Sequence, residues 1–220
     1  MNHAQCLSVF EKADLYVVIT TTFCAGRTAL AVLEETLAAG VRLVQMREKE
    51  LSGRALYELA REFRQRTAAV GALLIIDDRV DIALASGADG VHLGQEDLPV
   101  SAARLMGPDL IIGASTHALE EALAAAAAGA SYVNIGPVFA TQTKPTATPL
   151  GPEALERIAP YLQIPWSTMG GINLANIGQV VVHGARHPAV MSAVTAAADP
   201  REAALGLRRV ILAGGEREKI

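Results

Sequence analysis

Eight short runs rich in Val, Ile and Leu recur along this chain of 220 residues, and a stretch of helical character follows most of them. The runs lack the polar–apolar alternation of a half-exposed strand, so they are typical of strands buried on both faces of a parallel sheet. Several helical stretches end at glycine, where a left-handed C-cap is expected. The predicted strands are residues 15–19, 43–46, 73–76, 90–93, 110–112, 132–135, 165–169 and 189–191. The predicted helices include residues 29–39, 54–70, 118–128, 152–158 and 173–182.

Alternating strands and helices define the α/β class, and eight such units in a chain of this length predict a (βα)8 TIM barrel. A doubly wound open sheet is the alternative, because a count of strands does not establish that the sheet closes. No linker rich in Pro, Ser or Gly separates the first strand from the last, so residues 1–220 are predicted to form a single domain. We expect residues 1–13 and 214–220 to be loose ends.

The composition narrows the classes of partner. Hydrophobic residues make up 51% of the chain and charged residues 19%, which suits a large core and excludes disorder caused by excess charge. A formal net charge of −4 argues against nucleic-acid binding by phosphate neutralisation. Charge or glycine breaks each apolar stretch well before the roughly 20 residues of a membrane span.

Targeting and redox signals point the same way. The first residues carry no export signal, and Cys6 and Cys24 form neither a disulfide framework nor a metal-ligand spacing. We therefore expect a cytoplasmic protein whose partners are small molecules, with no membrane or nucleic-acid partner. The sequence leaves open whether it forms a homo-oligomer.

Polar side chains gather just after the predicted strands, where barrel enzymes carry their chemistry. Arg47, Lys49 and Lys144 would place three cations on one rim, which suits a diphosphate. Asp78 and Asp97 are oxygen donors on adjacent loops, able to hold one Mg²⁺ that bridges phosphate oxygens. Backbone N–H groups after the seventh strand and a hydroxyl after the eighth occupy the recurrent phosphate position of such barrels.

Each of these signals has a plainer reading on its own. Arg47 and Lys49 fit a solvated charge run, Asp78 fits a helix N-cap, and Ser192 fits the cap of the last helix. Among the histidines, His92 reads as a satisfied interior or rim residue and His117 as a helix-start residue. His3, His183 and His187 look incidental. The functional reading rests on all the polar groups falling at one end of one predicted scaffold.

Five segments together resemble the thiamine-phosphate synthase family, also called thiamine-phosphate pyrophosphorylase. They are VQMREK (residues 44–49), DDRVDIALASGADGVHLGQEDLP (77–99), IGAST (112–116), GPVFATQTK (136–144) and GGI (170–172). The resemblance extends from residue 15 to about residue 194. It implies a (βα)8 barrel that joins a hydroxymethylpyrimidine diphosphate to a thiazole phosphate, giving thiamine phosphate and diphosphate.

The resemblance also implies the residues of the site. The pyrimidine-diphosphate site would use Gln45, Arg47, Lys49, Ser115 and Lys144, with the backbone of residues 45–49, including Met46 and Glu48. Asp77 and Gln142 join the substrate-binding set, and Asp78 and Asp97 would hold the cofactor Mg²⁺. The thiazole phosphate would contact Thr141, Thr143, Gly171, Met191 and Ser192. The implied catalytic residues are Arg47, Lys49, Ser115 and Lys144.

The implied mechanism is dissociative. The cations and Mg²⁺ stabilise the departing diphosphate, the aminopyrimidine supports a methylene cation, and the thiazole nitrogen captures it. The protein then contributes positioning and electrostatics, with no covalent nucleophile.

Three places depart from the family pattern. Asp77 stands where the family has Asn, and an ionised Asp repels a diphosphate unless a further metal ion or Arg79 compensates. Residues 186–188, Arg-His-Pro, replace a small glycine-containing lead-in to strand eight, where Pro188 is expected to constrain the phosphate site. Residues 166–169 are bulkier and more polar than the usual strand seven.

These departures keep two alternatives open. Thiazole tautomerase relatives share the barrel and are isomerases that use a His in a position resembling His117. A non-catalytic barrel that binds a phosphate ligand is the other. The cation set and the Asp78/Asp97 pair favour the synthase, because a tautomerase needs neither magnesium nor a site for diphosphate.

Overall fold

The strands close into a barrel. The computed structural model describes residues 1–141 and 146–215, and its sheet is parallel throughout, in the order β7-β6-β5-β4-β3-β2-β1-β8. A parallel bridge between Thr168 and Pro188 joins the two outer strands. The strands are β1 (Tyr16–Ile19), β2 (Leu43–Met46), β3 (Leu73–Asp77), β4 (Gly90–Leu93), β5 (Ile111–Thr116), β6 (Tyr132–Ile135), β7 (Trp166–Thr168) and β8 (Ala189–Val190). The predicted (βα)8 barrel is confirmed, and the open sheet is wrong.

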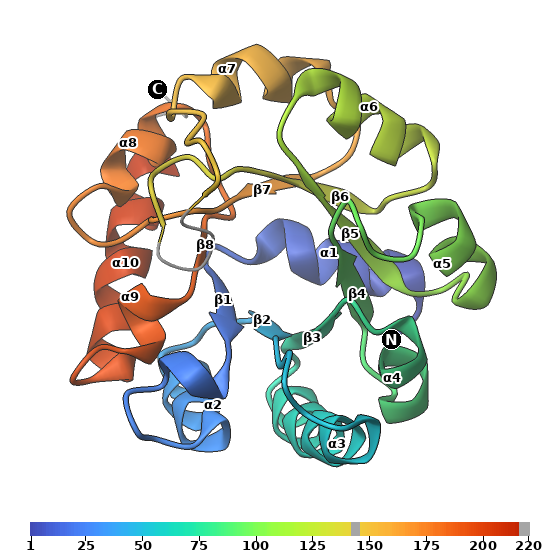
Figure 1. The fold of residues 1–220 in the computed structure, drawn as a ribbon. Helices are drawn as coiled ribbons and strands as arrows, with labels where there is room; N and C mark the ends of the chain where they lie inside the picture. The colour runs from blue at the N-terminus through green and yellow to red at the C-terminus, as the bar shows by residue number, and fades with distance from the viewer. Residues whose placement is uncertain (142–145, 216–220) are drawn as a thin grey trace.

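Apart from α1 (His3–Lys12), which crosses behind the strands in the view of Figure 1, the helices surround the strands on the outside. They are α2 (Ala29–Ala38), α3 (Gly53–Ala69), α4 (Val80–Ser86), α5 (Val100–Met106), α6 (Leu119–Ala127), α7 (Ala154–Ile158), α8 (Ile177–Val182), α9 (Ser192–Thr195) and α10 (Pro200–Gly215). Two 3₁₀ turns, η1 (Thr21–Phe23) and η2 (Ala159–Tyr161), complete the described elements. No helix in the described part of the chain is long and apolar enough to cross a membrane.

Alternate residues of each strand face opposite sides, and this separates two apolar clusters. Outward residues such as Val44, Ile76 and Val133 pack under the helices in the larger cluster. The inward residues Tyr16, Ile75 and Tyr132 belong to a second cluster that fills the lower barrel interior. The runs in the sequence are apolar at every position because both faces of each strand are covered.

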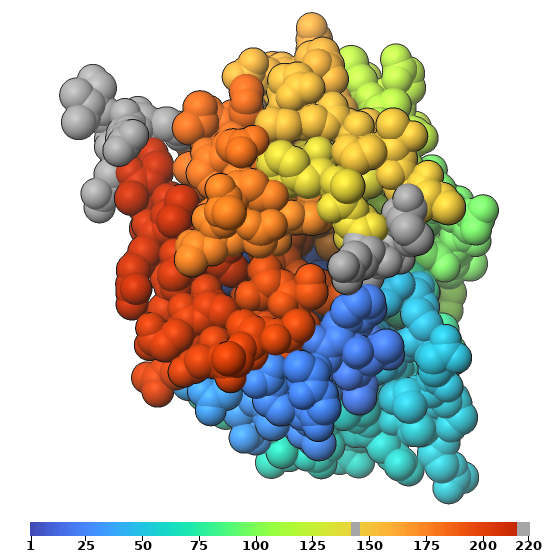
Figure 2. All heavy atoms as spheres, turned by 60° about the vertical axis from the view of Figure 1, so that its left-hand side comes forward, coloured from blue at the N-terminus to red at the C-terminus, as the bar shows by residue number. Residues whose placement is uncertain are grey.

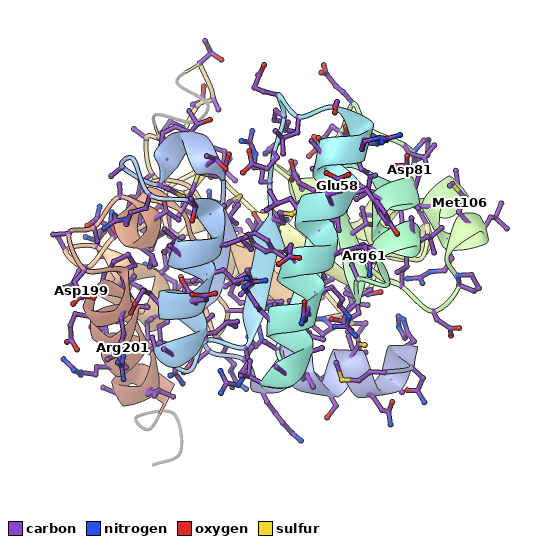
Figure 3. All side chains as sticks on the ribbon, turned by 90° about the horizontal axis from the view of Figure 1, so that it is seen from below. Glu58, Arg61, Asp81, Met106, Asp199 and Arg201 are labelled. Carbon is purple, nitrogen blue, oxygen red and sulfur yellow. The ribbon has the colours of Figure 1, made fainter. Side chains whose placement is uncertain are left out.

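The expectation of a loose N-terminus is wrong. Residues 3–12 form α1, which begins with a capping box between Asn2 and Gln5. Cys6 and Phe10 of α1 are fully buried in the interior cluster, and the ring of Phe10 lies 4.5 Å from that of Tyr132. Figure 3 shows α1 lying across the lower end of the barrel, nearly perpendicular to α2 and α3. The helix therefore closes the barrel at the end opposite the site.

At the C-terminus, residues 214 and 215 belong to α10 rather than to a loose end. Residues 216–220 lie outside the described residues.

The Arg-His-Pro departure also lies at this lower end. His187 is buried, and its Nδ1 is 2.6 Å from the carbonyl oxygen of Ala13, just after α1. Tyr16 N donates to the carbonyl of Pro188 at 3.1 Å. His187 is therefore not incidental, and Pro188 does not constrain the phosphate site, because residues that precede a strand lie at the opposite end from those that follow it.

Candidate functional site

A cavity of about 440 Å³ opens at the C-terminal end of the barrel, as expected for this fold. The predicted site residues that line it are Gln45, Arg47, Lys49, Asp77, Asp78, Asp97, Ser115, Thr141, Gly171, Met191 and Ser192. They come from strands or following loops around the whole barrel, so closure of the sheet brings them together. Gln142, Thr143 and Lys144 lie outside the described residues.

Two predicted residues, Met46 and Glu48, do not line this cavity. Met46 faces outward from β2 and is buried in the cluster beneath the helices. Glu48 accepts hydrogen bonds from the backbone N–H and the hydroxyl of Thr21, at 2.7 and 2.6 Å. Its carboxylate holds the β1–α2 loop and does not face the substrate cavity.

One wall of the cavity is charged, and it is built from the ends of β2 and β3. Lys49 pairs with Asp77 at 3.0 Å and also contacts Asp78, while Arg47 Nε lies 3.6 Å from Asp77. Burial opposes the charge of Lys49, but its contacts with Asp78 and Asp77 raise its pKa above the ordinary value. The cations therefore lie within reach of an anionic ligand while already paired with carboxylates.

The expectation that Arg79 could neutralise Asp77 is wrong. Arg79 binds Asp81 through two hydrogen bonds of 2.8 and 2.6 Å, beside the start of α4. Asp77 instead faces Arg47 and Lys49, and its buried Oδ2 is met by these ion pairs without a well-formed hydrogen bond. Burial raises the pKa of Asp77, with Lys49 opposing the shift.

This burial predicts that Asp77→Asn stabilises the fold at neutral pH by about 1 kcal/mol, a usual size for a single substitution. A carboxyl whose pKa is raised on folding binds its proton more tightly in the folded chain, so stability falls as the pH rises from the unfolded pKa through the folded one. The gain should therefore be present at pH 7 and vanish below about pH 4. Urea unfolding at several pH values measures it.

Asp81→Asn serves as the control of opposite sign, because its hydrogen bond to Arg79 lowers the pKa of Asp81. That contribution to stability is present above the unfolded pKa and is lost as the pH falls. A loss of stability at pH 7 in Asp77→Asn would show that its pairs with Arg47 and Lys49 outweigh its burial.

Two carboxylates approach each other at the edge of the charged wall. Burial raises the pKa of Asp97, and a hydrogen bond with Asp78 raises it further. Asp97 Oδ2 also accepts from the backbone N–H of Gly94 at 2.7 Å. Asp78 has a positive φ of +58°, in a tight turn where Arg79 N donates to the carbonyl of Asp77 at 2.7 Å. Such a conformation is costly for a residue other than glycine and is typical of functional sites.

The opposite, neutral wall is lined by uncharged residues and contains two adjacent glycines. It follows β7 and β8 and includes Gly170, Gly171 and Ser192. Gly170 and Gly171 have φ values of +107° and +64°, and a Cβ would lie 2.4 Å from Pro137 Cβ and 2.3 Å from the carbonyl oxygen of Ala140, respectively. Only glycine fits this turn against the β6–α7 loop.

The β1–α2 loop joins these two walls. The Arg27 guanidinium donates to the carbonyls of Thr195, Ala197 and Ala198, and Thr195 Oγ1 donates to the carbonyl of Phe23. Figure 2 shows the blue β1–α2 region packed beside the orange-red region of α9 and α10. Because Glu48 holds Thr21 on the other side, the same loop contacts both the charged wall and the neutral wall.

Several cavity residues escaped the sequence analysis. Asn134, Met169 and Asn173 line the cavity, and His92 is both satisfied, as predicted, and part of the cavity floor. Asn134 Nδ2 donates to Ser167 Oγ at 2.7 Å, which satisfies the unusual polarity of strand seven. The missed signal was the alternation of inward and outward residues along each strand, since Asn134 pairs with Ser115, and Ser167 pairs with Asn134, in the barrel register.

Comparisons with known proteins show the family to which the chain belongs. The family model described as thiamine monophosphate synthase matches residues 15–194. The thiamine-phosphate synthase of Moorella thermoacetica is 47% identical over 200 residues, covering 90% of this chain and 95% of that protein. The thiamine-phosphate synthase of Pyrococcus horikoshii is 42% identical over 201 residues, covering 91% and 96%.

A solved structure, thiamine phosphate pyrophosphorylase from Pyrococcus furiosus, superposes with a TM-score of 0.86 at 40% identity, covering 92% of this chain and 97% of that one. The chain is a (βα)8-barrel enzyme of the transferase class, and polar residues line a cavity at the C-terminal end of its barrel. The chain belongs to the thiamine monophosphate synthase family.

Proposed function

We propose that this chain condenses hydroxymethylpyrimidine diphosphate with thiazole phosphate, forming thiamine phosphate and diphosphate. The observation that carries the proposal is one cavity with two different walls, in a chain whose relatives are named as this synthase. Arg47 and Lys49 stand with carboxylates on one wall, and a glycine turn with Ser192 stands on the other. Two phosphorylated substrates therefore have separate places in the same cavity.

Asp78 and Asp97 suit a magnesium ion that is shared with the diphosphate. Mg²⁺ is commonly held by one or two carboxylates, several waters and substrate phosphates. Among residues 1–141 and 146–215, no group of three or more His, Cys, Asp or Glu side chains forms a larger metal cluster. Two carboxylates that lie close enough to raise a pKa, beside the ammonium group of Lys49, match the smaller set. When bound, Mg²⁺ would neutralise charge on the diphosphate oxygens.

The residues of this chain supply the rest of the chemistry. Arg47 and Lys49 stabilise negative charge on the diphosphate as the bond between its oxygen and the pyrimidine methylene carbon breaks. Gln45 and Ser115 hold the pyrimidine substrate, and the thiazole nitrogen then bonds to the methylene carbon. Rate acceleration comes from alignment of the two substrates and from fixed charge, without a covalent nucleophile. Lys144, Thr143 and Gln142 keep their predicted roles in substrate binding, and Lys144 its role as a further cation.

The thiazole phosphate is assigned to the neutral wall, with Thr141, Gly171, Met191 and Ser192 around its phosphate. Backbone N–H groups and a hydroxyl suit a phosphate that is held but not cleaved. Because both walls line the same cavity, the proposal puts the thiazole ring between the two anion sites.

The direct test is a coupled assay with both substrates and Mg²⁺. Diphosphate and thiamine phosphate should appear together and in equal amounts, and omission of either substrate should stop both. Isomerisation of a thiazole carboxylate phosphate without any condensation would support the tautomerase instead. Binding of phosphate ligands with no turnover would support the non-catalytic barrel. The names of the relatives favour the synthase. Action in the cytoplasm on these small molecules alone is part of the proposal.

Ser192→Ala is expected to raise the KM for thiazole phosphate about fivefold, with the KM for the pyrimidine diphosphate unchanged. The reason is the loss of one ordinary hydrogen bond, which contributes about 1 kcal/mol. Steady-state kinetics with each substrate varied in turn measures both values. Ser101→Ala, an exposed serine of α5, is the matched control. A change confined to the pyrimidine substrate would contradict the assignment of the neutral wall.

A further inference from the structure

The barrel interior beneath the cavity holds two tyrosines where aliphatic side chains are usual. Tyr16 and Tyr132 are fully buried, and their hydroxyl oxygens lie 3.0 Å apart. Each ring fills the interior cluster that α1 closes from below. Phenylalanine would fill that space without a buried hydroxyl, so the two hydroxyl groups require a reason beyond packing.

Hydrogen bonds extend from this pair to both sides of the cavity floor. Gln45 Nε2 donates to the Tyr16 hydroxyl at 3.0 Å. The Tyr132 hydroxyl lies 3.0 Å from His92 Nδ1, and His92 Nε2 lies 2.9 Å from Ser115 Oγ. A continuous hydrogen-bonded chain therefore joins Gln45 to Ser115, two residues that line the cavity.

The donor at one end sets the direction of the whole chain. The Nε2 group of Gln45 can only donate, so the Tyr16 oxygen accepts from it. The Tyr16 hydroxyl then donates to Tyr132, since these two hydrogen bonds are the ones that its hydroxyl makes within the described residues. Tyr132 in turn donates to His92 Nδ1, which leaves the imidazole proton on Nε2 to be donated to Ser115 Oγ.

A glycine in strand β5 leaves room for this chain of hydrogen bonds. Gly113 lies against the rings of Tyr132 and His92. A Cβ at this position would come within 2.1 Å of Tyr132 Cζ and 2.5 Å of His92 Nδ1. The His92 and Tyr132 rings lie with their centroids 5.6 Å apart. Burial raises the pKa of Tyr16 and of Tyr132, so both hydroxyls keep their protons.

We propose that Tyr16 and Tyr132 are positioning residues that fix the hydrogen-bonding roles of Gln45 and Ser115 toward the pyrimidine substrate. With its oxygen accepting from His92, Ser115 has its own O–H free to donate to a diphosphate oxygen. With Nε2 committed to Tyr16, Gln45 keeps Oε1 as an acceptor for an amino group of the substrate. The assignment of substrate rests on the proposed function, whereas the direction of the hydrogen-bonded chain does not.

The direction is tested on the protein without substrate, by ¹⁵N NMR of the histidine side chains. The His92 resonances are identified by their absence in a His92→Asn variant. The wild-type protein should show His92 protonated on Nε2 and not on Nδ1, and Tyr16→Phe should weaken this preference, because it cuts Tyr132 off from the Gln45 donor. In Tyr132→Phe the tautomer should shift toward Nδ1–H. Protonation of Nδ1 in the wild-type protein would overturn the proposal, whatever reaction the enzyme catalyses.

The positioning role is tested by kinetics. Tyr132→Phe should lower kcat/KM for the pyrimidine diphosphate about tenfold, the loss expected for one oriented hydrogen bond, and leave the KM for thiazole phosphate within about twofold. In a Ser115→Ala background, Tyr132→Phe should cause no further loss, because it acts through Ser115. Tyr16→Phe should behave in the same way toward Gln45→Ala.

Tyr57→Phe is the matched control, a half-buried tyrosine of α3 outside the cavity, and it should leave both substrates unaffected. Losses that multiply in the double variants would show a general structural role and overturn the proposal. If the wild-type enzyme performs no condensation, the proposed function fails while the NMR result still decides the direction of the chain.

Discussion

Asp78→Ala and Asp97→Ala are each expected to lose roughly 10²-fold in turnover, the scale of removing one group that stabilises developing charge. The structure places the two carboxylates together at the edge of the charged wall, where they would share one ion. Once one ligand is lost, the ion is no longer held in place, so the double variant should lose little more than either single variant.

The measurement is kcat as a function of Mg²⁺ concentration for the three variants, with circular dichroism to confirm the fold. Asp109→Ala, an exposed aspartate in the α5–β5 loop, is the matched control and should titrate like the parent. Independent losses that multiply in the double variant would mean that Asp78 and Asp97 do not serve a single ion.

The barrel could be predicted because its strands have a clear signature in the sequence. A strand covered on both faces must be apolar at every position, and eight such runs separated by helices leave few alternatives. The upper part of β5 was missed because its signal stops at Ile112. Ser115 and Thr116 continue the strand, since Ser115 faces the cavity and Thr116 Oγ1 donates to the carbonyl of Asn134.

The sequence of helix α1 contains signs of a helix that are easily missed, because the segment has few apolar residues. Asn2 and Gln5 have capping-box spacing, and Cys6 and Phe10 are four residues apart, on one helical face. A short helix with few apolar residues resembles a loose end until its partner is known. The partner here is the open lower end of the barrel, which only the closed sheet creates.

The position of most charged rim residues was predictable, but their pairing was not. Rim residues follow strands, so the sequence alone placed Arg47, Asp78 and Asp97 at one end. Which groups pair depends on contacts between strands distant in sequence. Asp77 is two residues from Arg79 and 28 from Lys49, yet it faces Lys49, because β2 and β3 are neighbours in the sheet.

Charged residues on the outer surface of the barrel can be compared with those that line the cavity. Glu58 and Arg61 project from α3 into solvent, and Asp81 lies on the neighbouring α4 (Figure 3). The charges of the rim differ because they converge on a cavity, where Asp77 is largely buried and partnered by two cations. Burial and convergence, and not charge alone, separate a functional group from a solvated face.

Lys49→Met is expected to lower kcat roughly 10²–10³-fold, because it removes a fixed positive charge from the departing diphosphate. The same substitution also removes the cation that Asp77 and Asp78 share and, among the described residues, leaves Asp77 with Arg47 alone, and carboxylates with less compensation near an incoming anion would oppose binding. Activity alone would therefore not separate the two causes. Lys12→Met, at the last turn of α1 and far from the cavity, controls for the substitution itself.

The double variant Lys49→Met/Asp77→Asn separates these causes. Neutralising Asp77 removes the buried charge that Lys49 had balanced, so stability in urea should recover toward that of the parent. If Lys49 acts on the leaving diphosphate, turnover should stay as low as in Lys49→Met, because no other change replaces its charge. Recovery of turnover together with stability would show instead that Lys49 serves only to neutralise Asp77, and its catalytic role would have to be withdrawn.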